Sequence, residues 1–361
     1  MPLYFKHVPL HGVERSMGVK LGDIITPEAV QTIALEALKG RVIALDAFNM
    51  LYQFLATIRG PDGRPLMDSR GRITSHLSGL FFRTVNLLEK GIKPVYVFDG
   101  RPPELKRATV EKRMELRKEA GELYEKALLA GDIEAARKYA QRAATLEEYM
   151  LESSKKLLDA MGIPTVQAPS EGEAQAAYMA AKGDVYASAS QDMDSLLFGS
   201  PRLVRNLSIV GKRKLPGKKA YVEVEPELIS LDALLSSLGI TRELLIDIGI
   251  LVGTDYCEGV KGIGPKKALK LVKEYGSAEK VLEALNVTLE VPLGVIRQIF
   301  LKPNVTDNYT LKWKGIDYAT VKSILCDEHD FSSDRVDKAL AELKVALEKG
   351  KGETSLDAWL G

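Results

Sequence analysis

The sequence has few of the residues that usually reveal a chemistry. Its 361 residues include only two cysteines, Cys257 and Cys326, which are too few for a disulfide framework and fit a reducing compartment. The four histidines are scattered and lack the spacing of a common zinc site. No apolar run reaches the roughly 18 residues that a membrane-spanning helix needs, so we expect no membrane partner.

Net charge is nearly absent as well. The 50 basic and 49 acidic residues leave a formal charge of +1, which excludes a uniformly basic coat of the histone type. The chain is 45% hydrophobic, so it can bury a sizeable core, and its length favours about two domains. Any function therefore depends on where the charges lie along the chain.

Short β-branched runs alternate with helical patterns in the first two thirds of the chain. Continuous apolar strands separated by helices predict an α/β fold with a mostly parallel central sheet and helices on both faces. The helical stretch at about 103–160 is longer than one crossover needs, which indicates an inserted helical subdomain. Beyond residue 225 the pattern is almost wholly helical, and a Gly/Lys-rich break at 349–352 predicts a detached tail. The expected strands are 41–46, 94–99 and 184–189.

Acidic residues gather where the predicted strands end. Asp46 and Asp99 end two strands, and Asp192 follows a third. Because the carboxyl ends of parallel strands share one edge of a sheet, where α/β proteins bind ligands, we expect these side chains to converge. Further acids lie at a helix start, beside Asp192 and after an apolar helix. These further acids are Glu171, Glu173, Asp194 and Asp255.

Carboxylates in such a group repel one another, and a divalent cation is the simplest compensation. Ligands that are all oxygen donors favour Mg²⁺ or Mn²⁺ over zinc or copper. Seven carboxylates exceed what one Mg²⁺ uses. They therefore predict two ions about 4 Å apart, the arrangement that serves phosphodiester hydrolysis.

Each acid also has an ordinary structural alternative. Asp46 or Asp99 could cap a helix or form a turn, and Ser170-x-x-Glu173 matches a capping box. Asp192 and the aspartate two residues later could form a solvated turn, or share one face if that stretch is extended. These alternatives stay open for single residues. The occurrence of acids at all three strand ends favours a metal site, because capping does not require an acid at every strand end.

Basic residues are concentrated in separate segments. Residues 195–222 and 260–273 contain Lys and Arg but no Asp or Glu, although a basic run is most often a solvated face. In Gly262-Ile-Gly264-Pro-Lys266-Lys267, two glycines permit close backbone approach and a helix begins at the proline. The exposed amides and lysines predict a phosphate site that binds the DNA backbone and reads no base.

The predicted insert supplies two further cations, Lys106 and Arg113. They lie seven residues apart, which places them on one helix face, where they could stabilise charge on a phosphate. Ordinary pairing with glutamates on an exposed helix is the alternative. Tyr52 follows Asp46 on a predicted helix and could stack on a base or belong to the core.

Several segments carry a resemblance to a known family. They are Ile43-Ala-Leu-Asp46-Ala, Val95-Tyr-Val-Phe-Asp99-Gly-Arg-Pro-Pro, Ala168-Pro-Ser-Glu171-Gly-Glu173-Ala, Ser190-Gln-Asp192-Met-Asp194 and Gly253-Thr-Asp255-Tyr-Cys-Glu-Gly-Val-Lys-Gly-Ile-Gly-Pro-Lys. With these segments the chain resembles the flap structure-specific endonucleases of the 5′-nuclease superfamily, and is most like the archaeal members. The resemblance extends from Met17 to the tail.

The resemblance implies an enzyme that removes 5′ flaps from branched double-stranded DNA and has 5′–3′ exonuclease activity. Its expected roles are Okazaki-fragment maturation and base excision repair. The seven acids fall on the family's two-Mg²⁺ site, where Mn²⁺ can substitute. Lys106 and Arg113 fall on the basic pair of the helical arch, and Tyr52 on an aromatic that stacks near the cleaved nucleotide. Thr74 lies in the region that receives a one-nucleotide 3′ flap.

The resemblance also implies partners. The glycine turn with Gly262, Gly264, Lys266 and Lys267 matches a helix–two-turn–helix that holds duplex DNA, in relatives with a bound K⁺. The tail resembles a box that binds the sliding clamp (proliferating cell nuclear antigen), although Glu353 replaces the usual Gln and Leu360 an aromatic. We expect a cytoplasmic monomer that works with the replication machinery. The apolar anchors of the tail would be Leu356, Trp359 and Leu360.

A division of the chain follows from these observations. We expect residues 1–16 to be an extension, either an expression remnant or a mis-assigned start before Met17. The remaining parts are the N-terminal part of the nuclease domain at 17–100, the arch at 101–146, the internal part of the nuclease domain at 147–240, the helix–two-turn–helix and C-terminal helical region at 241–346, and the clamp-binding tail at 347–361.

Three other functions fit parts of this pattern. A sister nuclease of the same superfamily, such as a 5′ exonuclease or a Holliday-junction resolvase, would share the acids, but the long insert and short tail favour flap cleavage. A non-catalytic scaffold for DNA junctions or the clamp would not need all seven acids. An aspartate-based phosphatase would need a second Asp two residues after Asp99, where this chain has Arg101.

Overall fold

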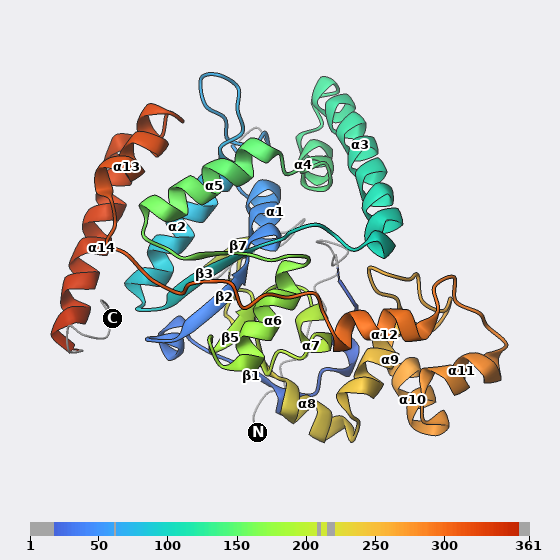
Figure 1. The fold of residues 1–361 in the computed structure, drawn as a ribbon. Coiled ribbons are helices and arrows are strands. Elements are labelled where there is room, and N and C mark those ends of the chain that lie inside the picture. Colours follow the sequence, from blue (N-terminus) through green and yellow to red (C-terminus); the bar gives the residue numbers. More distant parts are fainter. Residues whose placement is uncertain (1–17, 61–62, 208–210, 215–220, 354–361) are drawn as a thin grey trace, which may run out of the picture.

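A seven-stranded sheet forms the centre of the molecule (Figure 1). The computed structural model describes residues 18–60, 63–207, 211–214 and 221–353. Within them the strand order is β1-β9-β6-β5-β2-β3-β4. The strands are β1 (Val30–Thr32), β2 (Val42–Asp46), β3 (Lys93–Phe98), β4 (Thr165–Gln167), β5 (Ala187–Ala189), β6 (Arg202–Arg205) and β9 (Glu227–Ser230).

Most neighbouring strands of this sheet are parallel, as the sequence predicted. Strand β2 pairs in parallel with β3 on one side and with β5 on the other. Strand β3 then pairs in parallel with β4, and β5 with β6. Only the edge formed by β9 is antiparallel, to β6 on one side and β1 on the other. The chain builds β2, β3 and β4 in one direction and then returns to β5 on the other side of β2. This reversal places a topological switch point at the carboxyl end of β2, where α/β sheets bind ligands.

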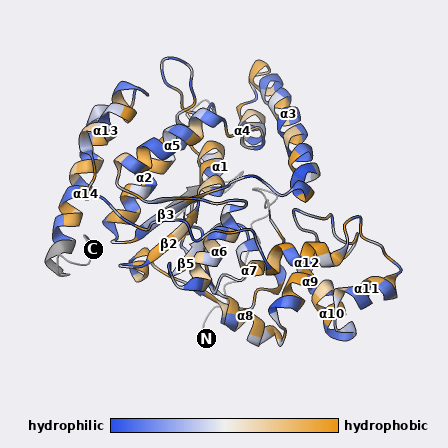
Figure 2. Ribbon diagram, viewed as in Figure 1, coloured by the Kyte–Doolittle hydropathy of each residue, from blue (hydrophilic) through white to orange (hydrophobic). Residues whose placement is uncertain are grey.

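Alternate residues of the central strands pack into two different cores. Ile43, Leu45 and Tyr96 face a core shared with helices α1, α2, α5 and α14, whereas Ala44 and Val95 face α6. The period of two in a strand therefore explains why both faces of β2 and β3 are apolar. Figure 2 shows these central strands as hydrophobic. The helices are α1 (Ala47–Thr57), α2 (Ser75–Glu89), α5 (Glu148–Ala160), α6 (Gly172–Lys182) and α14 (Ser333–Glu353).

A second helical region packs beyond α6 and shares a core with β6 and β9. Its helices α9 and α12 are tied by Arg297, whose guanidinium donates to the buried Asp247 at 2.6 and 2.9 Å. The same Asp247 accepts the amide of Ala278 at the start of α11. The helices of this region are α7 (Asp194–Leu197), α8 (Leu231–Leu238), α9 (Arg242–Val252), α10 (Pro265–Tyr275), α11 (Ala278–Leu285) and α12 (Leu293–Leu301).

The predicted helical insert is present as two helices, α3 (Arg107–Leu129) and α4 (Ile133–Arg142). They pack against each other away from the sheet (upper right in Figure 1). The turn between them uses Gly131, whose φ of 70° favours glycine, and Asp132, which caps α4 by accepting the amide of Ala135. Arg59 at the end of α1 donates to the carbonyl of Ala140 at 2.7 Å and so connects the insert to the central domain.

The remaining elements are short. They are the 3₁₀ turns η1 (Gly22–Ile24), η2 (Pro27–Ala29), η3 (Leu35–Leu38) and η4 (Glu104–Lys106), the paired strands β7 (Gly211–Lys214) and β8 (Tyr221–Val224), α13 (Tyr318–Lys322) and the π turn η5 (Ser323–Asp327). No helix in the described part of the chain is both long and apolar enough to cross a membrane.

The predicted break at 349–352 is wrong. Helix α14 continues through these residues to Glu353. Two glycines weaken a helix by about 1 kcal/mol each relative to alanine, which the rest of a 21-residue helix outweighs.

A buried histidine lies in the first turn of α2. The side chain of His76 is fully buried, its Nε2 lies 3.0 Å from the Ser153 hydroxyl, and its ring meets the edge of Tyr149. Its Nδ1 is buried and has no hydrogen-bond partner in the described part of the chain. Burial, followed by the charge of the nearby His329, lowers the pKa of His76 to about 3.

This histidine makes stability depend on pH. The unfolded chain binds a proton at His76 below about pH 6.5, whereas the folded chain stays neutral there until about pH 3, so stability falls as pH decreases between those values. Between pH 7 and 5 we expect wild type to lose about 2 kcal/mol more unfolding free energy than His76→Phe. Denaturant unfolding at both pH values measures this difference. Equal losses in the two proteins would contradict the assignment.

Candidate active site

Two carboxylates lie at adjacent strand ends. Asp46 is the last residue of β2 and also the N-cap of α1, where its Oδ1 accepts the amide of Asn49 at 3.0 Å. Asp99 directly follows β3, and its Oδ1 accepts the amide of Gly172 at 2.7 Å. Asp46 therefore caps α1 and also lies at the switch point of the sheet.

Gly172 permits this contact between β3 and α6. A Cβ atom at this position would lie 2.7 Å from the Asp99 Oδ1 and 3.1 Å from the Val97 carbonyl, so the close approach requires glycine. The capping box considered as an alternative for Ser170-x-x-Glu173 does not form, since the N-cap is Glu171 and its side chain does not cap the helix. Glu171 is instead buried, and its carboxylate accepts hydrogen bonds from Lys106 and Tyr256.

Asp192 and Asp194 lie in a bend after β5, and the extended stretch considered for them is wrong. Asp194 is already the first residue of α7. Asp192 accepts the side-chain amide of Asn49 at 3.1 Å, and Asp194 accepts the amide of Val19 at 2.9 Å. A Cβ atom on Gly18 would lie 2.5 Å from the Asp194 Oδ2, so the chain near Gly18 lies directly against this acid.

Two cations of the insert are bonded to this group of acids. The Lys106 ammonium contacts Glu171 and lies 2.9 Å from the Asp255 Oδ2, while the Arg113 guanidinium contacts both oxygens of Asp255. The hydroxyl of Thr109 adds a bond of 2.8 Å to the Asp255 carbonyl. The first turns of α3, together with Lys106 just before them, are thus tied to the acids.

Pairing with a glutamate on an exposed helix face, the alternative considered for Lys106 and Arg113, is found for Arg107 instead. Arg107 pairs with Glu111 four residues later, and both side chains are more than half exposed. Lys106 is instead 17% exposed. Burial alone would lower the pKa of Lys106, but Glu171 and Asp255 raise it overall, so this side chain stays charged.

The acids are close enough to repel one another. Burial, followed by the charge of other acids, raises the pKa of Asp194 to about 8. Burial also raises the pKa of Asp99 to about 6, although Lys106 and the amide of Gly172 lower it in part. The pKa values of Asp46 and Glu173 also lie well above their ordinary values, because of burial first and the charge of other acids second. Ionisation of all these acids would therefore place more negative charge in the buried site than its own cations compensate.

The donor set fits hard divalent cations. The predicted ligands offer only carboxylate oxygens, and Oε1 of Glu173 is buried with no hydrogen-bond partner in the described part of the chain. As the side chains are placed, however, no three Asp, Glu, His or Cys groups among the described residues are arranged to hold a metal ion. Two of the acids, Glu171 and Asp255, are instead bonded to Lys106 and Arg113.

Tyr52 lies outside the cores. It is half-buried on α1, and the guanidinium of Arg117 lies 4.4 Å from the centre of its ring. Arg117 also donates to the Tyr52 hydroxyl at 3.1 Å. The Tyr52 ring is covered by a cation from the insert. If that cation moved away, the ring could stack on a base.

Thr74 lines a cavity of about 200 Å³ whose wall contains none of the seven acids. The residue is buried just before α2, and the cavity wall also includes Phe82, Phe331 and Arg335. Hydroxyl, aromatic and guanidinium groups together can hold a polar ligand that has an apolar face.

The glycine turn between α9 and α10 has the expected form. Gly262 has a φ of 81°, and Gly264 is the N-cap of α10, which begins with a proline at its first position. The side chains of Lys266 and Lys267 are exposed on the first turn of this helix. The helix N-terminus and its lysines therefore offer backbone amides and positive charge to an anion.

Two residues that contact the acids were missed by sequence reasoning. Asn49 lies one turn after Asp46, and Tyr256 directly follows Asp255, so adjacency to a predicted ligand was the available signal. Tyr256 is 4% exposed, and its ring meets the edge of Phe300.

Two predicted segments lie outside the described residues. They are the tail with Leu356, Trp359 and Leu360, and the extension at 1–16.

Comparison with known families identifies the class of protein. The XPG N-terminal domain family matches residues 17–120, and the XPG I-region family matches residues 162–255. The catalytic core of Rad2, solved in complex with a DNA substrate, has a similar structure, with a TM-score of 0.68, 25% identity and coverage of 89% of this chain and 98% of that one. Fold and site thus define a nuclease, a hydrolase that acts on DNA phosphodiester bonds.

The relatives narrow this class to one family. Flap endonuclease 1 of Pyrococcus furiosus is 59% identical over 344 residues, which cover 95% of this chain and 99% of the relative. The solved flap endonuclease-1 of Methanococcus jannaschii is 44% identical, with a TM-score of 0.72 over 92% of this chain and all of that one. The chain belongs to the flap endonuclease 1 family of the 5′-nuclease superfamily.

Proposed function

We propose that this nuclease cleaves 5′ flaps on branched double-stranded DNA with the help of two divalent metal ions held by its seven acids. The observation that carries the proposal is the convergence of acids at the switch point, where the site's own cations do not compensate all of them in ionised form. Four of the acids have raised pKa values because burial and neighbouring carboxylates disfavour their charged forms. The proposed ligands are Asp46, Asp99, Glu171, Glu173, Asp192, Asp194 and Asp255.

Mg²⁺ suits this donor set, and Mn²⁺ can substitute. When bound, two such ions activate a water for in-line attack and neutralise the charge on the leaving oxygen. The protein's part is to hold the carboxylates in place. The hydrogen bonds from Asn49, Val19, Gly172 and Tyr256 orient individual acids.

Lys106 and Arg113 are proposed to contact the scissile phosphate. In the structure both are bonded to carboxylates, so the proposal requires them to exchange these partners for phosphate oxygens. A cation on a phosphate oxygen stabilises the charge that develops during cleavage. Tyr52 is proposed to stack on the nucleotide beside the cleavage position, with the Arg117 guanidinium displaced from its ring.

Other parts of the molecule are proposed to position the branched DNA. The cavity beside Thr74 is the proposed site for a one-nucleotide 3′ flap. Gly262 and Gly264, with Lys266 and Lys267, are proposed to hold the duplex backbone, with K⁺ as an additional ligand of that turn. The nuclease domain would then comprise residues 17–100 and 147–240, interrupted by the arch at 101–146.

The family supports a cellular role for the chain. We propose 5′–3′ exonuclease activity beside flap cleavage, and a role for a cytoplasmic monomer in Okazaki-fragment maturation and base excision repair. The names of the relatives support flap cleavage. Clamp binding through Leu356, Trp359 and Leu360 is supported only by the sequence of the tail.

Cleavage of a labelled double-flap duplex tests the proposed function. Wild type is expected to cut near the flap junction with Mg²⁺ and not with EDTA. Asp192→Ala should lower the single-turnover rate by about a thousand-fold, because several kcal/mol of charge stabilisation depend on the metal ligands. Circular dichroism controls for folding. Metal-independent cleavage, or full activity of a folded Asp192→Ala protein, would disprove the metal assignment.

The role of the arch cations has a matched control on the same helix. Lys106→Met should lower the single-turnover rate by about a hundred-fold or more, because one group that stabilises developing charge is lost. Lys112 lies between Lys106 and Arg113, but its ammonium pairs with the exposed Glu258. Lys112→Met is therefore expected to change the rate by less than about twofold. Similar effects of the two substitutions would show that the insert contributes only general positive charge.

A further inference from the structure

Asn49 connects the ends of two neighbouring strands, through its side chain on the β5 side and through its backbone amide on the β2 side. Its Nδ2 donates to the Asp192 Oδ2 at 3.1 Å, and its Oδ1 accepts the amide of Gln191 at 3.4 Å. Its own backbone amide donates to the Asp46 Oδ1 at 3.0 Å. One residue thus contacts the acid that ends β2 and the acid that follows β5.

The direction of the Asn49 amide is determined by its surroundings. The amide of Gln191 can only donate, so it must face the carbonyl oxygen of Asn49 and not the NH₂ group. The NH₂ group then points to the carboxylate of Asp192, which accepts hydrogen bonds. The position therefore needs a side chain with a donor toward Asp192 and an acceptor toward Gln191. The short amide side chain of asparagine supplies both groups.

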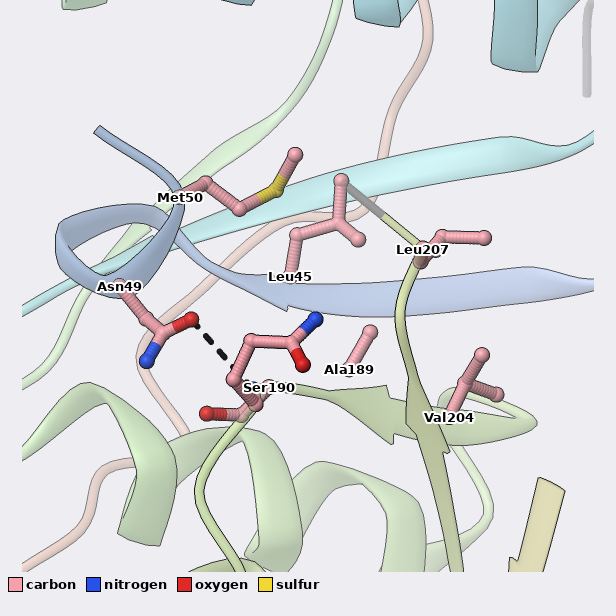
Figure 3. A pocket seen from close by; sticks show the side chains of 8 residues that line it. Leu45, Asn49, Met50, Ala189, Ser190, Val204 and Leu207 are labelled. Atoms are coloured by element: carbon pink, nitrogen blue, oxygen red, sulfur yellow. Dashed lines mark hydrogen bonds between the residues drawn. The ribbon is translucent and has the colours of Figure 1, made fainter. Parts of the chain in front are cut away.

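The other side of Asn49 is apolar. Figure 3 shows the side chain extending from α1 toward the chain just after β5, next to a hollow of only about 10 Å³. The wall of this hollow includes Leu45, Met50, Ala189 and Val204. The side chain therefore has little room to turn away from Asp192, and an aliphatic residue of the same size would be accommodated.

We propose that Asn49 is a positioning residue that holds Asp192 at a fixed distance and orientation from Asp46, and that it sets the affinity of the site for divalent metal ions. The proposal rests on the proposed function, in which both acids are metal ligands. Partners that orient metal ligands typically change metal affinity by 10- to 100-fold when they are removed. Because Asn49 is uncharged, it orients Asp192 without competing with a metal ion for its charge.

Metal binding to the full chain without DNA tests this role. Wild type, Asn49→Leu and Asn49→Ala are titrated with Mn²⁺, and free Mn²⁺ is measured by electron paramagnetic resonance. We expect both variants to bind Mn²⁺ at least about 10-fold more weakly than wild type. Asn86→Leu is the matched control, since Asn86 is a half-buried helix residue on α2 remote from the acids. It should bind like wild type.

Cleavage rates across a range of Mg²⁺ concentrations separate positioning from a general structural defect. For the Asn49 variants the half-saturating Mg²⁺ concentration should rise by about the same factor, while the rate at saturating Mg²⁺ returns to within a few-fold of wild type. A lower rate with unchanged Mg²⁺ dependence, or unchanged Mn²⁺ affinity, would overturn the proposal. Failure of wild type itself to bind Mn²⁺ would instead overturn the proposed metal site.

Discussion

The mutual repulsion of buried carboxylates is the constraint on which the rest of the site depends. The strand order brings the ends of β2, β3 and β5 together, and acids follow all three. Each acid is desolvated, and the neighbouring charges raise the pKa of several of them. Such a group is stable only beside compensating positive charge. In this structure Lys106 and Arg113 supply part of that charge, and they come from the insert.

This compensation connects three parts of the molecule. Any cation that binds Glu171 or Asp255 must share these acids with Lys106 or Arg113. In the proposed function, binding of divalent metal ions and release of the first turns of α3 would therefore be coupled, because both depend on the same oxygens. Tyr52 would be affected as well, since Arg117 of the same helix α3 covers the Tyr52 ring. A DNA phosphate that attracts the arch cations would free the acids for metal ions.

Much of the fold could be predicted because its signals are local. Continuous apolar strands between helices indicated the parallel sheet, and acids at strand ends indicated the site. The partners of each acid could not be predicted. Asn49 meets Asp192 across 143 positions of sequence, and that contact depends on the register of β2 against β5. The capping box considered for Ser170 and Glu173 does not form, because the N-cap of α6 is Glu171, whose side chain bonds to Lys106 and Tyr256 and does not cap the helix.

Diffraction from crystals soaked in Mn²⁺ tests the proposed metal site, because anomalous scattering locates the ions without any assumption about activity. We expect two anomalous peaks among the seven carboxylates, with Lys106 and Arg113 no longer bonded to Glu171 and Asp255 where an ion has replaced them. The absence of Mn²⁺ among these carboxylates at a concentration that supports cleavage, or ions bound only elsewhere, would contradict the proposed site.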